Sequence, residues 1–103
     1  MDNLSWLQDW YAAQCDGEWE HQYGLSIETL DNPGWALKVN LSGTAYADLR
    51  FEAIERKGED DWIRCSTSNK NFEGVGGAKN LDEVIGIFRR WITHQQASEI
   101  TNV

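Results

Sequence analysis

Apolar residues near the start of the chain recur at steps of three and four, which is the spacing of a helix with one apolar face. Asp2 or Asn3 can cap the first turn, and Gly17 is a typical helix terminator. The pattern therefore predicts an amphipathic helix over residues 4–15. Its apolar positions are Leu4, Trp6, Leu7, Trp10, Tyr11 and Ala13.

After Gly17 the apolar pattern changes to strict alternation, which is typical of a strand with one buried face. Apolar and polar residues alternate over 23–28 and again over 35–41. Between these segments lies DNPG, at 31–34, in which each residue favours a turn. The two segments are therefore predicted to form a β-hairpin.

Two more alternating segments follow the hairpin. Residues 47–53 alternate after a turn at 42–44, and residues 62–65 alternate after the polar segment KGEDD at 57–61. Short polar turns between successive strands are typical of an antiparallel sheet in which each strand pairs with the next. The sequence thus predicts a four-stranded meander.

The last element has the clearest pattern. Asn80 followed by Glu83 can form a capping box, and a continuous apolar stripe runs from Leu81 to Ile92. The preceding GVGGAK, at 74–79, matches neither common phosphate-loop motif and is interpreted as a flexible connection. A second amphipathic helix is therefore predicted from residue 81 onward.

The order of the elements indicates the fold class. Two amphipathic helices flank four strands, and both most economically cover the same face of the sheet. We therefore predict an α+β fold, with a four-stranded antiparallel sheet (meander) and an N-terminal and a C-terminal helix packed on one face. The chain of 103 residues is long enough for one domain, which we place at residues 1–96, with a frayed tail at 97–103.

Charge is distributed unevenly along the chain. The formal net charge is −8, from 17 acidic and 9 basic residues, and seven of the acids precede Lys38, which is the first lysine or arginine. Such a surface would repel a phosphate backbone and attract a basic protein. The distribution therefore favours a protein partner over a nucleic acid. The seven early acids are Asp2, Asp9, Asp16, Glu18, Glu20, Glu28 and Asp31.

The sequence also favours a cytoplasmic location. No run of apolar residues approaches the roughly 18 that a membrane span needs, and the first residues do not resemble a secretion signal. Cys15 and Cys65 fit this compartment as reduced thiols. We therefore expect a cytoplasmic protein that binds no membrane.

The segment CDGEWEHQYG, at 15–24, concentrates reactive side chains. A metal site would need Cys65 and His94 as well as Cys15 and His21, at spacings that match no common metal motif. A thiolate centre or an acid–base pair in this segment lacks the surrounding residues that such catalysis requires. We therefore expect no metal, no cofactor and no catalytic residue, and we interpret the carboxylates as an acidic surface.

Six tryptophans are many for a chain of this length. Two of them, Trp19 and Trp62, lie off the predicted core faces and beside acidic residues. Because tryptophan is enriched at binding hot spots, these two are candidate anchors for a partner. Ordinary core packing is expected for the other four, which are Trp6, Trp10, Trp35 and Trp91.

Several segments together resemble one protein family. They are WLQDWYAAQCDGEWEHQYG, SIETLDNPGWALKVNLSGT, DDWIRCS, NFEGVGG and NLDEVIGIFRRWI. They resemble the immunity protein 53 family of bacterial polymorphic toxin systems, over about Leu4 to Ile92. The resemblance implies a small cytosolic protein, encoded beside a toxin, that protects the producing cell by binding and blocking the toxin domain.

Surface chemistry, and not the resemblance, suggests where a toxin would bind. A nuclease must carry positive charge to hold its substrate, so carboxylates would speed association and tryptophans would add affinity. We predict a toxin-binding patch of Asp16, Glu18, Trp19, Glu20 and His21, with Trp62 near them. Two other functions stay open, namely an acidic interaction or adaptor domain with a non-toxin partner, and a small enzyme that uses Cys15 or paired acids.

Overall fold

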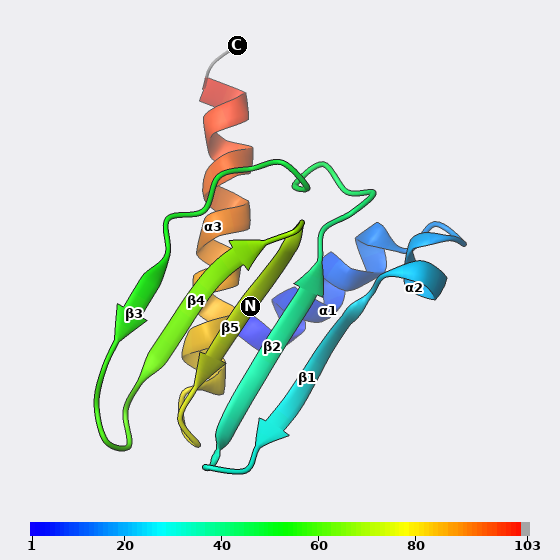
Figure 1. The fold of residues 1–103 in the computed structure, drawn as a ribbon. Coiled ribbons are helices and arrows are strands. Elements are labelled where there is room, and N and C mark those ends of the chain that lie inside the picture. The colour runs from blue at the N-terminus through cyan, green and yellow to red at the C-terminus, as the bar shows by residue number, and fades with distance from the viewer. Residues whose placement is uncertain (102–103) are drawn as a thin grey trace.

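The structure is a computed structural model that describes residues 1–101, with side chains described for residues 1–94. Helices α1 and α3 lie at the two ends of the chain, and both lie behind an antiparallel sheet in the view of Figure 1. The predicted α+β class with a helix at each end is therefore confirmed. The elements are α1 (Asn3–Gln14), α2 (Trp19–Gln22), β1 (Leu25–Leu30), β2 (Gly34–Asn40), β3 (Ile54–Arg56), β4 (Ile63–Ser68), β5 (Asn71–Gly76) and α3 (Leu81–Thr101).

The sheet differs from the predicted meander in both the number and the order of its strands. Within the described residues it has five strands in the order β1-β2-β5-β4-β3, so the prediction of four strands is wrong. The sequence predicted neither β3 nor β5, and β5 pairs with β2 and β4 at the centre of the sheet. Its buried positions are Phe72, Gly74 and Gly76, and glycine gives no hydrophobic signal in a sequence.

The prediction of a strand over residues 47–53 is also wrong. Residues 41–53 form an irregular connection, which crosses the ends of the central strands from β2 to β3 at the far edge (Figure 1). Local turns hold this connection, for example the hydrogen bond from the Leu49 N–H to the Tyr46 carbonyl at 3.3 Å. Leu49 and Phe51 pack against the core, which explains the alternating pattern without strand pairing.

Aromatic side chains from α1, the sheet and α3 meet in the core. Phe88 of α3 is fully buried, and its ring centroid lies 5.1 Å from that of Trp10 and 5.0 Å from that of Phe72. Trp91 is buried beside it, and Trp6 packs against the same cluster. Core packing is therefore confirmed for Trp6, Trp10 and Trp91. Trp35 is half-buried, and its indole N–H donates to the Ala78 carbonyl at 2.9 Å.

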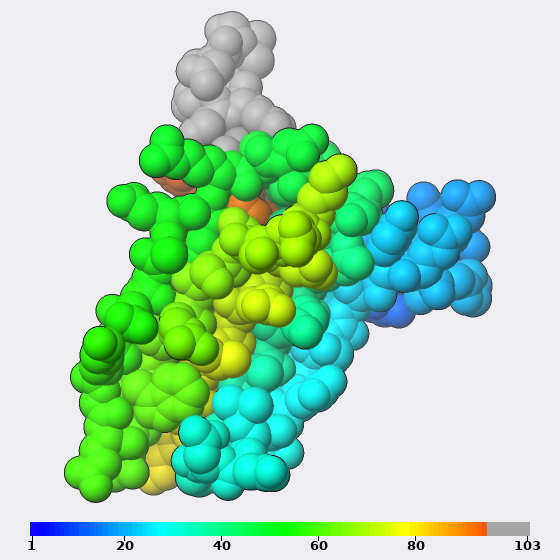
Figure 2. All heavy atoms as spheres, viewed as in Figure 1, coloured from blue at the N-terminus to red at the C-terminus, as the bar shows by residue number. Residues whose placement is uncertain are grey.

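The face of the sheet turned away from α1 and α3 is polar, and Figure 2 shows this face. Ser26, Lys38, Glu73 and Ser66 lie side by side across four strands on it. Lys38 and Glu73 form an ion pair at 3.4 Å, and both side chains are well exposed. Water therefore suffices to cover this face.

No helix among the described residues is both long and apolar enough to cross a membrane.

The domain boundary at residue 96 stays a prediction. The backbone of α3 is described through Thr101. Residues 102–103, and the side chains from residue 95 onward, lie outside the described part of the chain. The predicted frayed tail at 97–103 falls largely on those residues.

Candidate functional site

The acidic segment between α1 and β1 forms a tight, self-contained turn. Gly17 has a φ of +95°, a conformation that favours glycine and lets the chain reverse after α1. The Asp16 carboxylate accepts hydrogen bonds from the N–H groups of Glu18 and Trp19, both at 2.9 Å. The Glu20 carboxylate accepts in return from the N–H groups of Asp16, at 3.0 Å, and of Gly17. We name the residues Asp16, Glu18 and Glu20 the acidic corner.

The carboxylates of the acidic corner divide into two that hold the turn and one that faces solvent. The N–H groups of Trp19 and Glu18 lower the pKa of Asp16, and the pKa of Glu20 is lowered by its own N–H and by those of Asp16 and Gly17. Glu18 is exposed, and within the described residues its carboxylate makes no hydrogen bond or ion pair. Glu18 is therefore the member of the corner that is free to meet a partner.

Trp19 is not a surface residue, contrary to the prediction. It is only 3% exposed, because α2 turns its ring onto the end of α1. The ring centroid lies 6.1 Å from that of Trp10, edge to face, and 5.7 Å from that of Tyr11. Trp19 thus fixes the acidic corner to the core, and its burial removes it as a direct anchor for a partner.

Trp62 is half-buried, but it does not lie near the acidic corner as predicted. It immediately precedes β4, and its carbonyl accepts a hydrogen bond from the N–H of Gly77 at 3.1 Å. This end of the sheet also carries the turn between β1 and β2, and the acidic corner adjoins the opposite end of β1 (Figure 1). The length of a strand therefore separates Trp62 from the other predicted residues, among which His21 is exposed on α2.

The structure has an apolar groove next to the acidic corner, which the sequence did not predict. It has a volume of about 350 Å³ and lies between α1, α2 and β1. Of the five large hydrophobic side chains that are exposed among the described residues, three line it: Leu4, Tyr11 and Tyr23. We name it the α1–β1 groove, and its lining residues are Leu4, Leu7, Gln8, Tyr11, Glu20, Tyr23, Gly24, Leu25 and Ile27.

A signal for this groove is present in the sequence of α1. Leu7 and Trp10 are buried under the sheet, whereas Leu4 and Tyr11 lie one heptad apart and are exposed. The apolar arc of α1 is therefore wider than the core covers. A helix with such an arc offers apolar surface to a second neighbour.

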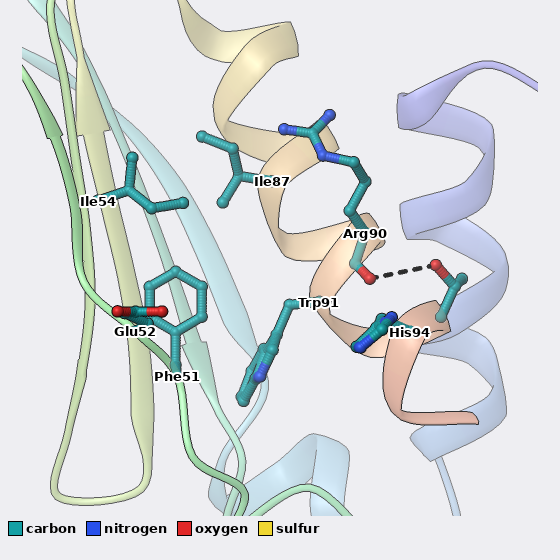
Figure 3. A pocket seen from close by; sticks show the side chains of 8 residues that line it. Phe51, Glu52, Ile54, Ile87, Arg90, Trp91 and His94 are labelled. Carbon is teal, nitrogen blue, oxygen red and sulfur yellow. Dashed lines mark hydrogen bonds between the residues drawn. The ribbon is translucent and has the colours of Figure 1, made fainter. Parts of the chain in front are cut away.

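A second groove lies between β3 and α3 (Figure 3). Its volume is about 670 Å³, and the rings of Phe51 and Trp91 meet edge to face in it, with centroids 5.3 Å apart. Arg90 and His94 of α3 contribute polar groups to its lining. None of the six residues predicted for the toxin-binding patch lines this groove, which we name the β3–α3 groove. Its lining residues are Phe51, Glu52, Ile54, Ile87, Arg90, Trp91, Thr93 and His94.

The reactive side chains considered for a metal or a thiolate centre do not converge. In the described part of the chain no group of three or more histidine, cysteine and acidic residues could hold a metal ion. Both cysteines are free thiols. Cys65 is buried in the middle of β4, and this burial raises the pKa of its thiol to about 11, so it stays protonated and unreactive at neutral pH.

Comparison with protein families decides the affiliation of the chain. The model of the immunity protein 53 family matches residues 4–93, which is most of the chain. The chain belongs to the immunity protein 53 family. No curated protein and no solved structure matches it significantly. The match runs from α1 into α3, so the acidic corner and the α1–β1 groove both lie within the part that defines this chain as an immunity protein 53 member.

Proposed function

We propose that this chain binds a cognate toxin domain and neutralises it by binding, without a catalytic step of its own. Membership of the immunity protein 53 family supports a toxin as the partner. The toxin-facing surface in this proposal is the acidic corner together with His21 and the adjoining groove. The partner would be a basic protein such as a nuclease.

One observation carries the choice of surface. The first 33 residues, which build α1, α2 and β1, contain seven side-chain carboxylates and no lysine or arginine. Figure 2 shows that the segment joining α1 to β1 projects from the body of the molecule, where a partner can reach it. A projecting acidic segment attracts a positively charged surface over a distance of about 8 Å at physiological salt. Charge therefore supports fast capture of a toxin that must itself be basic to hold nucleic acid.

Co-expression tests the proposed function directly. We expect cells that produce the toxin domain encoded beside this protein to survive when they also produce this chain, and to die without it. We also expect the pair to co-purify at low salt and to dissociate more readily at high salt, because screening weakens attraction between exposed charges. Absence of both rescue and a complex would contradict the proposed function, whereas rescue by a salt-insensitive complex would contradict the electrostatic part.

A charge reversal at Glu18 tests the acidic corner. We expect Glu18→Lys to slow association with the toxin domain by a few-fold to about tenfold at low salt and to reduce the salt dependence of the rate. Glu20 is a poorer choice because its carboxylate holds the turn. Stopped-flow mixing measures the association rate. Glu59→Lys is the matched control, because Glu59 is exposed in the β3–β4 turn and its replacement changes the charge by the same amount. Equal slowing by both variants would reject a local role for the acidic corner.

A further inference from the structure

The outer edge of β1 offers unpaired main-chain groups. In the described residues β1 lies at one end of the sheet and pairs with β2 alone. The N–H of Asn40 donates to the Gly24 carbonyl at 3.0 Å, so Gly24 and Asn40 form a hydrogen-bonded pair at the start of the β1–β2 ladder. Because hydrogen-bonded and non-hydrogen-bonded pairs alternate in an antiparallel ladder, Leu25, Ile27 and Thr29 direct their N–H and carbonyl groups away from β2.

The two edges of the sheet are not equivalent. The other edge strand, β3, has three residues, and its Arg56 is held by ion pairs of 2.6 Å to both Asp61 and Glu83. Short, charged edge strands of this kind resist pairing with another chain. β1 is twice as long, its only charged residue is Glu28, and it contains no proline, so its edge is less protected. β1 is therefore the edge that can accept an added strand.

The α1–β1 groove lies directly beside this open edge. Leu25 and Ile27 line the groove, and each has main-chain groups that point outward from β1. Successive side chains of a strand point to opposite faces of a sheet. A strand added to β1 would therefore place every second side chain over the groove, against the exposed apolar groups of Leu4 and Tyr11.

Charge specifies the chemistry of the added strand. Glu20 lines the groove, Glu28 is exposed on the opposite face of β1, and Asp31 is exposed just after β1. No lysine or arginine occurs in the sequence before Lys38. The side chains that suit this surface are apolar ones over the groove and basic ones beside Glu28.

We propose that the toxin presents an extended segment of alternating apolar and basic residues that adds as a strand to the outer edge of β1. This inference rests on the proposed function and names the contact through which the toxin is held. Main-chain hydrogen bonds to Leu25, Ile27 and Thr29 supply affinity, and the α1–β1 groove supplies specificity.

A pair of variants at Thr29 separates main-chain pairing from side-chain contact. Thr29→Pro removes the outward N–H and leaves the ladder to β2 intact, since Thr29 and Trp35 form a non-hydrogen-bonded pair. Thr29→Ala keeps the N–H and removes the exposed side chain. We expect Thr29→Pro to raise the Kd for the purified toxin domain at least about tenfold and Thr29→Ala to change it less than about threefold. Calorimetric titration measures both, after thermal unfolding has shown that both variants fold.

Amide hydrogen exchange of the unaltered protein provides a second test that needs no variant. In the free protein we expect the amides of Ser26 and Glu28 to be protected by β2 and those of Leu25, Ile27 and Thr29 to exchange fast. Addition of the toxin domain should protect the second set and leave the amides of β3 unchanged. If Thr29→Pro does not fold, this measurement decides the question.

The outcomes separate strand addition from the proposed function. If the unaltered protein binds the toxin but the outward amides stay unprotected, strand addition is overturned and toxin binding stands. If Leu4→Lys weakens the complex and Thr29→Pro does not, the groove holds a helix or a loop of the toxin, which also overturns strand addition. If the unaltered protein neither binds nor rescues, both proposals fail.

Discussion

We expect Phe88→Ala to lower the free energy of unfolding by about 3–5 kcal/mol. Phe88 is fully buried, and its ring contacts Trp6, Trp10, Phe72 and Trp91, which come from α1, β5 and α3. The substitution leaves a cavity where the two helices and the sheet meet, so each of them loses packing contacts. A domain of this size has about 5–15 kcal/mol of stability in total, so the substitution removes a large share of it.

Urea denaturation followed by circular dichroism and tryptophan fluorescence measures this effect. Tyr23→Ala is a suitable control because Tyr23 is 44% exposed, and we expect it to cost about 1 kcal/mol or less. A Phe88→Ala variant that loses no more stability than Tyr23→Ala would show that the core is not organised around Phe88.

The elements that the sequence predicts well are those in which side-chain spacing repeats over many residues. α3 shows a full apolar stripe from Leu81 to Ile92, and Val84, Ile85, Phe88 and Ile92 of that stripe are buried. The β1–β2 hairpin has alternation on both sides of a turn, and the pairing of Leu30 with Gly34 closes it at the predicted place. In both cases local spacing and tertiary packing impose the same pattern, so the pattern suffices.

β4 overlaps the strand predicted at 62–65, but β3 and β5 could not be predicted, because local spacing does not report pairing. Leu49 and Phe51 alternate with polar residues and pack against the core, yet their backbone belongs to a connection. In β5 the opposite occurs, because Gly74 and Gly76 face the core with no side chain to mark them. The insertion of β5 between β2 and β4 depends on contacts between residues far apart in the sequence, which periodicity does not contain.

The candidate site was predictable in its charge and not in its shape. The cluster of acids before Lys38 is visible in the sequence, and the structure gathers Asp16, Glu18 and Glu20 in one turn. The burial of Trp19 depends on its contact with Trp10 across the α1–α2 turn, which single-residue tendencies do not reveal. The open edge of β1 likewise follows from strand order alone.

We expect Gly74→Ala to lower the free energy of unfolding by about 1–3 kcal/mol. A Cβ atom on Gly74 would collide with the Cγ1 methyl of Val84 in α3 and would lie 3.2 Å from Phe72 Cε1 and 3.3 Å from Cys65 Sγ. α3 rests directly on the bare backbone of β5 at this point, so even one methyl group forces the helix away from the sheet. A glycine in a flexible connection would tolerate alanine, so this variant distinguishes the observed central strand from the loop that the sequence pattern indicates.

A double-mutant cycle with Val84→Ala assigns the loss to this collision. Val84→Ala alone leaves a cavity, but in the double variant the alanine methyl at position 74 occupies part of the space that the valine methyl vacates. We therefore expect the double variant to lose about 1 kcal/mol less free energy of unfolding than the two single variants lose together, as measured by urea denaturation. Glu73→Ala on the same strand is the control, since its exposed side chain forms an ion pair with Lys38 and should couple to Val84 negligibly. Strict additivity between positions 74 and 84 would mean that α3 does not pack on β5 at Gly74, and the placement of β5 under α3 would then be wrong.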